Sequence, residues 1–197
     1  DGESIADLSA PILKYLSEEC LKNILTALKV KKGDLIFFGA GKEKIVNDYM
    51  SRLIAKIGMD LNLLKDGFEA CWITDFPMFE ETSDGSLTSL HHPFTCPVET
   101  ELEKLGKLSP LEINSKAYDM VINGVEIGGG SIRIHKKALQ EKVFELLGLS
   151  EDEAQKKFGF FLKTLTTGCP PHGGIAFGLD RLAMLMVGAE SIRDVIA

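Results

Sequence analysis

Apolar and polar residues alternate on both sides of Asn123-Gly124, and this is the most regular pattern in the chain. The alternation predicts strands over residues 118–122 and 125–127, because successive side chains of a strand point to opposite faces of a sheet. An Asn-Gly pair between two such runs is typical of a two-residue hairpin, in which Ile122 faces Val125. This hairpin is the expected centre of the fold.

The predicted hairpin brings two carboxylates to one face of the sheet. Val121 faces Glu126, and Asp119 faces Gly128, which leaves open space where a side chain would stand. The carboxylates are then diagonal neighbours, about 7–8 Å apart at the backbone, and repel each other unless a cation lies between them. Mg²⁺ fits, with oxygen ligands at about 2.1 Å and substrate phosphates completing its octahedron. The alternative is a hairpin with solvated acids on its wet face and a loose turn at residues 128–130.

The spacing of apolar positions predicts the remaining helices and strands. The first 30 residues have a helical period with Ser17 as a cap, and Ser150 with Glu153 forms a capping box. Helices are further expected over residues 42–57, 98–108 (a solvated insertion), 137–146, 150–165 and 179–187. Strands are expected over residues 35–38, 70–74, 76–79, 87–90 and 175–178.

The character of the chain changes at residues 61–66, from helical to sheet-like. We therefore expect two parts: residues 1–64 as a small α/β unit, and residues 65–197 as an α+β unit with a mostly antiparallel sheet flanked by helices. Gly39-Ala40-Gly41 precedes a helix but lacks the spacing and the Lys-Ser/Thr of a phosphate-binding loop. We interpret it as a packing feature.

Composition narrows the class of protein. The 197 residues are 45% hydrophobic and 26% charged, which is enough to bury a substantial core. The net charge of −7 argues against a generic nucleic-acid-binding surface. With no bilayer-length apolar run, no secretory signal and no C-x-x-C among the four cysteines, we expect a reduced, cytoplasmic protein without a membrane segment. Because it begins at Asp1, we expect it to be a piece of a longer protein.

Four further side chains are candidates for ligand contact. His91 and His92 lie side by side between a predicted strand and a proline, and adjacent strand residues point to opposite faces, so at most one normally reaches a given site. Arg133 offers a planar fork suited to a carboxylate or phosphate. Arg181 falls in the first turn of a predicted helix, where the helix dipole repels a cation unless it faces an anion or an aromatic ring. The alternatives are satisfied loop histidines and an exposed arginine paired with Asp180 or another neighbour.

A series of segments, in this order, resembles bacterial-type aspartyl-tRNA synthetase, a class II aminoacyl-tRNA synthetase. They are WITDFPMFE (72–80), HHPFTCP (91–97), AYDMVINGVEIGGGSIRIH (117–135) and FGLDRLAMLMVGAESIRDVIA (177–197). Residues 178–181, Gly-Leu-Asp-Arg, are similar to the third signature motif of class II enzymes. Residues 65–197 resemble the second half of the catalytic domain. Residues 1–64 resemble the carboxyl-terminal part of the domain inserted in bacterial aspartyl enzymes, which also occurs in an amidotransferase subunit acting on charged tRNA.

The resemblance implies an ATP-dependent ligase that forms aspartyl-adenylate from L-aspartate and Mg-ATP, then passes the aspartyl group to the 3′ end of tRNA(Asp). It also implies which residues form the site. The magnesium ligands are Asp119 and Glu126. The residues at the bound aspartate are His91, His92 and Arg133. The residues at ATP are Glu126, Gly178, Leu179, Asp180 and Arg181, of which Glu126 and Arg181 are the expected catalytic residues.

The chain also departs from the family pattern. We find neither the first motif, which builds the dimer interface, nor the second, which supplies the arginine for the α-phosphate, and the anticodon-binding barrel is absent. The resemblance implies a homodimer for the full-length enzyme. Because this chain lacks those parts, we expect it to activate aspartate poorly or not at all. The alternatives are a non-catalytic synthetase paralogue, an aspartate-adenylating enzyme like asparagine synthetase, and a tRNA-binding protein linked to an amidotransferase.

Overall fold

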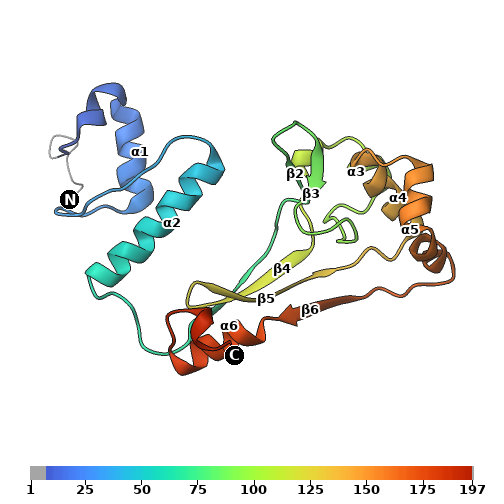
Figure 1. The fold of residues 1–197 in the computed structure, drawn as a ribbon. Coiled ribbons are helices and arrows are strands. Elements are labelled where there is room, and N and C mark those ends of the chain that lie inside the picture. Colours follow the sequence, from blue (N-terminus) through green and yellow to red (C-terminus); the bar gives the residue numbers. More distant parts are fainter. Residues whose placement is uncertain (1–7, 197) are drawn as a thin grey trace. The chain divides into compact units, whose positions relative to one another are not determined.

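The computed structural model describes residues 8–196, which divide between Lys65 and Asp66 into two units. The first contains η2 (Pro11–Tyr15), α1 (Glu18–Leu28) and α2 (Glu43–Asp60) (Figure 1). Ser17 caps α1, because its side chain accepts a hydrogen bond from the backbone N–H of Cys20, as predicted. The part of the predicted helical region that covers residues 1–7 lies outside the described residues.

The first unit corrects one sequence prediction. The strand expected over residues 35–38 is wrong: the segment has no regular structure, and Leu35 is 76% exposed. A strand needs a neighbouring strand to pair its backbone groups, and the described residues of this unit contain none. The helical period of apolar residues therefore predicted the helices of this unit correctly. A short apolar run does not reveal whether another strand is available to pair with it.

The second unit is built around a four-stranded antiparallel sheet in the order β1-β4-β5-β6 (Figure 1). Its strands are β1 (Ala70–Ile73), β4 (Ala117–Ile122), β5 (Val125–Ile132) and β6 (Gly173–Phe177). A separate hairpin pairs β2 (Phe79–Glu81) with β3 (Leu87–Ser89). The remaining elements are α3 (Leu102–Leu105), η3 (Pro110–Glu112), α4 (Lys137–Leu146), α5 (Glu151–Thr166), α6 (Leu179–Val187) and η4 (Ile192–Asp194). The prediction of a mostly antiparallel sheet flanked by helices is confirmed.

The central hairpin has the predicted turn but not the whole predicted register. Asn123 and Gly124 have φ of 51° and 79°, as a two-residue hairpin turn requires, and Val121 pairs with Glu126. Beyond that pair the register shifts, so that Asp119 lies opposite Gly129. The prediction that it faces Gly128 is therefore wrong by one residue. The reason is a β-bulge that adds one residue to β5, and a bulge cannot be read from alternation alone.

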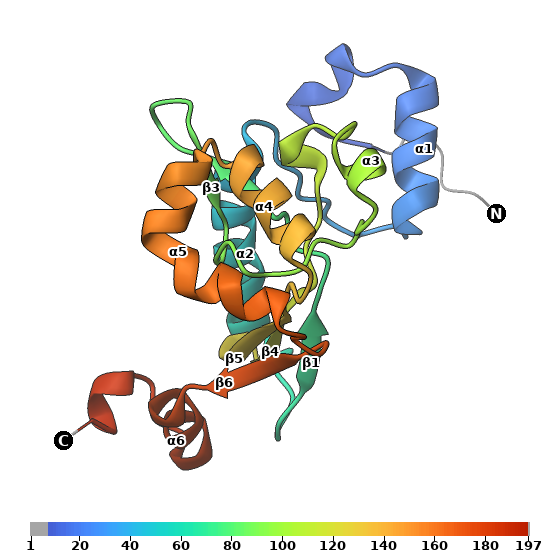
Figure 2. The ribbon, with the colours of Figure 1, turned by 90° about the vertical axis from the view of Figure 1, so that its right-hand side faces the viewer.

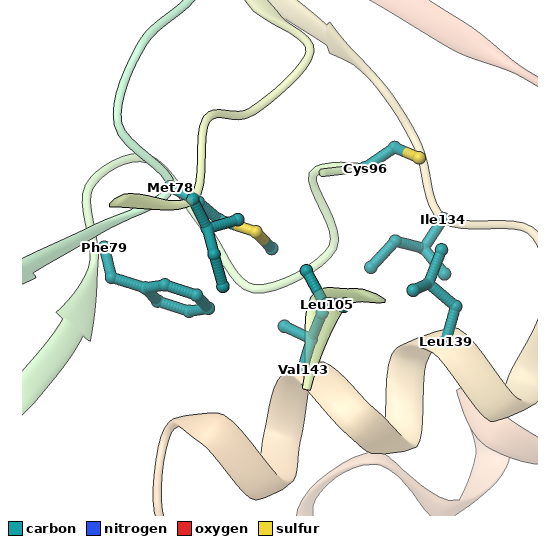
Figure 3. Close-up of a cluster of buried hydrophobic side chains, with 8 residues drawn as sticks. Met78, Phe79, Cys96, Leu105, Ile134, Leu139 and Val143 are labelled. Carbon is teal, nitrogen blue, oxygen red and sulfur yellow. The ribbon is translucent and has the colours of Figure 1, made fainter. Parts of the chain in front are cut away.

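Two hydrophobic clusters pack the end of this unit where α3, α4 and α5 gather (Figure 2). The first joins the β2–β3 region to α4, and its labelled side chains converge in Figure 3: Met78, Phe79, Cys96, Leu105, Ile134, Leu139 and Val143. Residues 98–108 are mostly exposed, as expected of a solvated insertion, but Leu105 is fully buried and the expected helix is much shorter than predicted. Only one helical turn forms there, and it contributes to the core.

The second cluster joins α4 to α5. Its buried members are Phe144, Ala154, Leu162 and Leu165. The predicted capping box is confirmed: Ser150 accepts from the N–H of Glu153, whose carboxylate accepts from the N–H of Ser150. Across the described residues, no helix is long and apolar enough to cross a lipid bilayer.

Candidate active site

A cavity of about 370 Å³ borders the bulged part of the β4–β5 hairpin. Its lining residues come from the loop after β3, from β4, from β5 and from the segment just after β5: His91, His92, Asp119, Glu126, Gly129, Gly130, Ser131 and Arg133. Five of these are sequence-predicted site residues. The structure therefore brings the predicted metal ligands and the predicted aspartate-binding residues to one place.

Asp119 and Glu126 converge over Gly129. A Cβ added to this glycine would stand 2.5 Å from Oδ1 of Asp119 and 3.8 Å from Oε1 of Glu126. Burial raises the pKa of Asp119 above its ordinary value, the nearby charge of Glu126 raises it further, and His91 opposes the shift. The two carboxylates thus concentrate negative charge at one point of the cavity.

This arrangement fits a hard divalent cation that shares its coordination with a ligand. The described residues contain no group of three or more histidine, cysteine or acidic side chains placed to hold a metal. A magnesium ion, however, is commonly bound by one or two carboxylates, with phosphates and water supplying the other oxygens. Asp119 and Glu126 have the chemistry for that role, which stays a prediction.

Arg133 and His92 are in contact with each other and form another part of the lining. The backbone N–H of Arg133 donates to the carbonyl of His172 at 2.9 Å, which ties the residue to the segment leading into β6. Its Nη1 lies 3.1 Å from Nδ1 of His92 and closer still to Nε2. Burial lowers the pKa of His92, and the charges of Arg133 and His91 lower it further. A neutral imidazole beside a guanidinium is therefore favoured at neutral pH.

Both histidines line the cavity, although alternation along a strand would have sent them to opposite faces. The rule does not apply, because residues 91 and 92 follow β3 in a bend rather than in a strand. The ring of His91 packs edge-on against Phe76, with ring centroids 4.8 Å apart. The loop thus presents two imidazoles to one space.

The start of α6 lies beside Glu126. The N–H of Gly178 donates to the carbonyl of Ile127 at 2.7 Å, so the helix begins directly against the bulged strand. Arg181 then donates from Nη1 to the backbone carbonyl of Glu126 at 2.9 Å, and the same nitrogen is 3.4 Å from Oε2 of that residue. The cation in the first helical turn therefore faces an anion, and its partner is Glu126 rather than Asp180.

The other residues expected at ATP lie outside the lining of the cavity. Gly178, Leu179 and Asp180 are exposed at the beginning of α6 and, like Arg181, do not line the cavity. Arg181 is nevertheless joined to the site through Glu126. The roles expected of these residues stay predictions.

Sequence reasoning missed Ser131 and Thr95. Ser131 lines the cavity and is 2% exposed, and Thr95, also 2% exposed, lies behind it with its Oγ1 3.4 Å from Oγ of Ser131. A usable signal existed, because Ser131 alternates with Gly129 and Arg133 on the same face of the chain. No local signal identifies Thr95, whose position depends on the pairing of distant segments.

The chain is similar to several solved structures. An aspartyl-tRNA synthetase from Entamoeba histolytica is 22% identical, with a TM-score of 0.49 over 88% of this chain and 28% of that one. A putative aspartyl-tRNA synthetase from Leishmania major Friedlin is 20% identical, with a TM-score of 0.49 over 84% and 26%. An Entamoeba histolytica asparaginyl-tRNA synthetase in complex with asparaginyl-adenylate is 19% identical, with a TM-score of 0.48 over 91% and 33%. The chain spans only a quarter to a third of these proteins.

The sequence also matches a family model. The model describes tRNA synthetases class II (D, K and N), and the match runs from residue 2 to residue 197. It therefore covers the antiparallel sheet, the cavity and the start of α6. Because the match spans nearly the whole sequence, the chain belongs to the class II tRNA synthetases of the D, K and N group.

Proposed function

We propose that the protein containing this chain is an aspartate–tRNA ligase, which activates L-aspartate with Mg-ATP and transfers it to the 3′ end of tRNA(Asp). The observation that supports this most is the cavity of about 370 Å³, whose lining combines an arginine fork and two histidines with a pair of carboxylates. The lining therefore holds one group that attracts an anion and two that attract a cation. An amino acid with a carboxylate side chain and a metal-bound nucleotide have these complementary charges.

Arg133 is the proposed determinant of the amino-acid side chain. Its guanidinium can hold a carboxylate with two parallel hydrogen bonds. Asparagine would present an amide NH₂ to a group that only donates, and lysine would present a like charge. Selection of aspartate over both thus follows from one side chain, with His91 and His92 as further contacts of the bound substrate.

Asp119 and Glu126 are the proposed holders of Mg²⁺, which when bound would neutralise phosphate charge and orient the phosphates for attack by the substrate carboxylate. Glu126 also accepts a hydrogen bond from Arg181 through its backbone carbonyl. This contact supports the proposed role of Arg181 at the polyphosphate of the nucleotide, with Gly178, Leu179 and Asp180 proposed to shape the nucleotide pocket around the start of α6.

The whole protein is proposed to act as a cytoplasmic homodimer with tRNA(Asp), L-aspartate and ATP as partners. Residues 1–64 are proposed to be part of an inserted domain, and residues 65–197 to be the second half of the catalytic domain. Since the chain spans a quarter to a third of the solved structures that it matches, its own activity is expected to be very low.

The test is ATP–pyrophosphate exchange with aspartate, asparagine or lysine as the amino acid, using the full-length protein and the 197-residue chain in parallel. We expect the full-length protein to catalyse exchange with aspartate and not with asparagine or lysine, and we expect the 197-residue chain to catalyse almost none. Preference for asparagine or lysine would overturn the substrate assignment. No exchange with any of the three would favour a non-catalytic paralogue.

A second assay separates the remaining enzymatic alternative. With aspartate and ATP supplied, the full-length protein is offered either tRNA or ammonia as acceptor. We expect aspartyl-tRNA and no asparagine. Formation of asparagine would identify an enzyme like asparagine synthetase instead.

A further inference from the structure

The least explained group beside the cavity is the buried hydroxyl of Thr95. Its Oγ1 lies 3.4 Å from Nδ1 of His92 and 3.4 Å from Oγ of Ser131. Thr95 and Ser131 are each 2% exposed, so neither hydroxyl can rely on bulk water for its hydrogen bonds. The hydroxyl therefore links the ring that touches Arg133 to the serine that lines the cavity wall.

We propose that Thr95 is a positioning residue that determines which ring nitrogen of His92 carries the proton, and thereby allows Arg133 to exchange an imidazole for a carboxylate. The proposal rests on the proposed function of the cavity as a carboxylate site. It concerns a residue that would not touch the substrate and would act only through His92.

His92 Nδ1 has three polar neighbours, and one of them, Nη1 of Arg133 at 3.1 Å, can only donate. The backbone N–H of Phe94 points at Nδ1 from 3.2 Å and can only donate, so it favours an unprotonated Nδ1. The hydroxyl of Thr95 is the one of the three that can also accept, so a proton on Nδ1 finds a hydrogen bond only there. Because donors and an acceptor are within reach of the same atom, either tautomer of neutral His92 finds a hydrogen bond without moving the ring far.

One tautomer suits the cavity without a ligand. The guanidinium of Arg133 only donates, and Nε2 is the nearer of the two ring nitrogens to its Nη1, so donation to Nε2 leaves that nitrogen unprotonated and puts the proton on Nδ1. That proton goes to Oγ1 of Thr95, and the hydroxyl hydrogen of Thr95 goes to Oγ of Ser131. The result is an uninterrupted sequence of donors and acceptors from Arg133 through His92 and Thr95 to Ser131.

The other tautomer suits a bound carboxylate. When a carboxylate takes the Nη1 hydrogen bond of Arg133, Nε2 of His92 loses its donor and is better protonated, so that it also donates to the ligand. Nδ1 then accepts from the N–H of Phe94. One proton leaves Nδ1 and one arrives at Nε2 through cavity water, so His92 stays neutral, in accord with the lowering of its pKa by burial and by Arg133.

The test is the tautomeric state of His92 in the 197-residue chain, read from the two ring ¹⁵N chemical shifts at neutral pH. Thr95→Val and Thr95→Ser form a matched pair, because valine keeps the shape without the hydroxyl and serine keeps the hydroxyl. We expect the Nδ1–H tautomer to predominate in the unchanged chain and in Thr95→Ser. In Thr95→Val we expect the populations to reverse toward Nε2–H, because the groups that remain at Nδ1, the N–H of Phe94 and Nη1 of Arg133, can only donate.

Ser131→Ala provides a second variant should Thr95→Val fail to give a folded amide spectrum. Removing the acceptor of the Thr95 hydroxyl should shift the populations in the same direction but less. A purely structural role of Thr95 would lower stability and leave the ring shifts unchanged, which would overturn the proposal, as would an Nε2–H tautomer in the unchanged chain. Since no catalysis is measured, failure of the exchange assay and failure of this test are distinguishable.

Discussion

The two faces of the four-stranded sheet differ in chemistry, because all the polar and charged side chains of its strands that border the cavity lie on one of them. By register, one face carries Asp119, Glu126 and Ser131 beside the cavity. The opposite face carries only apolar and aromatic side chains: Trp72, Tyr118, Met120, Ile122, Ile132, Ile175 and Phe177. Trp72 is 54% exposed there, so this face is not a core in the described structure. A sheet of alternating residues thus separates a polar site from an apolar surface by the thickness of one backbone.

The three consecutive glycines of β5 allow close contacts on both faces of the sheet. Gly129 makes room for the carboxylate of Asp119. On the apolar side β6 approaches so closely that a Cβ on Gly130 would collide with the carbonyl of Gly174, which also accepts a 3.0 Å hydrogen bond from the hydroxyl of Tyr118. The interpretation of residues 128–130 as a loose turn is therefore wrong. Glycine is required here by close approach, not by turn geometry.

The largest expected effect is on the free energy of unfolding. It shows whether the second unit is stabilised by its two helical clusters or by the apolar face of its sheet. Phe144→Ala should lower the free energy of unfolding by about 3–5 kcal/mol, since it opens a cavity among buried rings. Phe144 stacks on Phe158 with centroids 5.0 Å apart. Trp72→Ala is the matched aromatic deletion on the sheet face and should cost much less. Urea unfolding of the 197-residue chain measures both, and an equal loss would contradict the distinction.

The next effect concerns the polar face. Arg133→Lys in the full-length protein should reduce aspartate-dependent ATP–pyrophosphate exchange about 10²-fold, because lysine keeps the charge but loses the bidentate fork. Arg52→Lys is the control, since Arg52 is exposed on α2 and forms an ion pair with Asp48, one helical turn away. Full activity of Arg133→Lys would remove this residue from the proposed substrate contacts.

Substitution of two adjacent glycines compares the faces directly. Gly130→Ala should destabilise the chain by about 1–3 kcal/mol, because the new Cβ meets the backbone of β6, which cannot move independently. Gly129→Ala should cost less, since its new Cβ meets the movable carboxylate of Asp119. In the full-length protein, however, Gly129→Ala should raise the Mg²⁺ concentration needed for exchange. Thermal unfolding of the 197-residue chain measures the stability of each variant, and a magnesium titration of the exchange reaction measures the Mg²⁺ requirement of the full-length variants.

The smallest expected effect is a pH dependence of stability. Because burial and Glu126 raise the pKa of Asp119 in the folded chain, its ionised form costs stability above that pKa, and the cost disappears as pH falls and the group is protonated. Asp119→Asn should therefore raise the unfolding midpoint at neutral pH and not at acidic pH. An increase of equal size at both values would show that charge is not the cause.

Local patterns predicted what depends on neighbouring residues and missed what depends on distant ones. The hairpin turn, the caps at Ser17 and Ser150 and the limits of α4 follow from residues close in sequence. The same holds for the convergence of Asp119 and Glu126. The burial of Leu105 and the place of Thr95 depend on contacts between segments far apart in the chain, which no periodicity encodes. The strand predicted over residues 35–38 did not form for the same reason, since it would have needed a pairing partner from elsewhere in the chain.

The single extra residue in β5 decides the parity of everything that follows it. Glu126 and Arg133 are seven positions apart, an odd separation that in a regular strand sends two side chains in opposite directions. The bulge turns this odd count into an even one, and so a carboxylate and a guanidinium border the same cavity. Regular pairing of the same residues without the bulge would preserve every chemical group and yet divide the cavity's charges between two sides of the sheet. A single deletion in this stretch should therefore keep both groups on one side only when it removes the bulge, as deletion of Ile127 would.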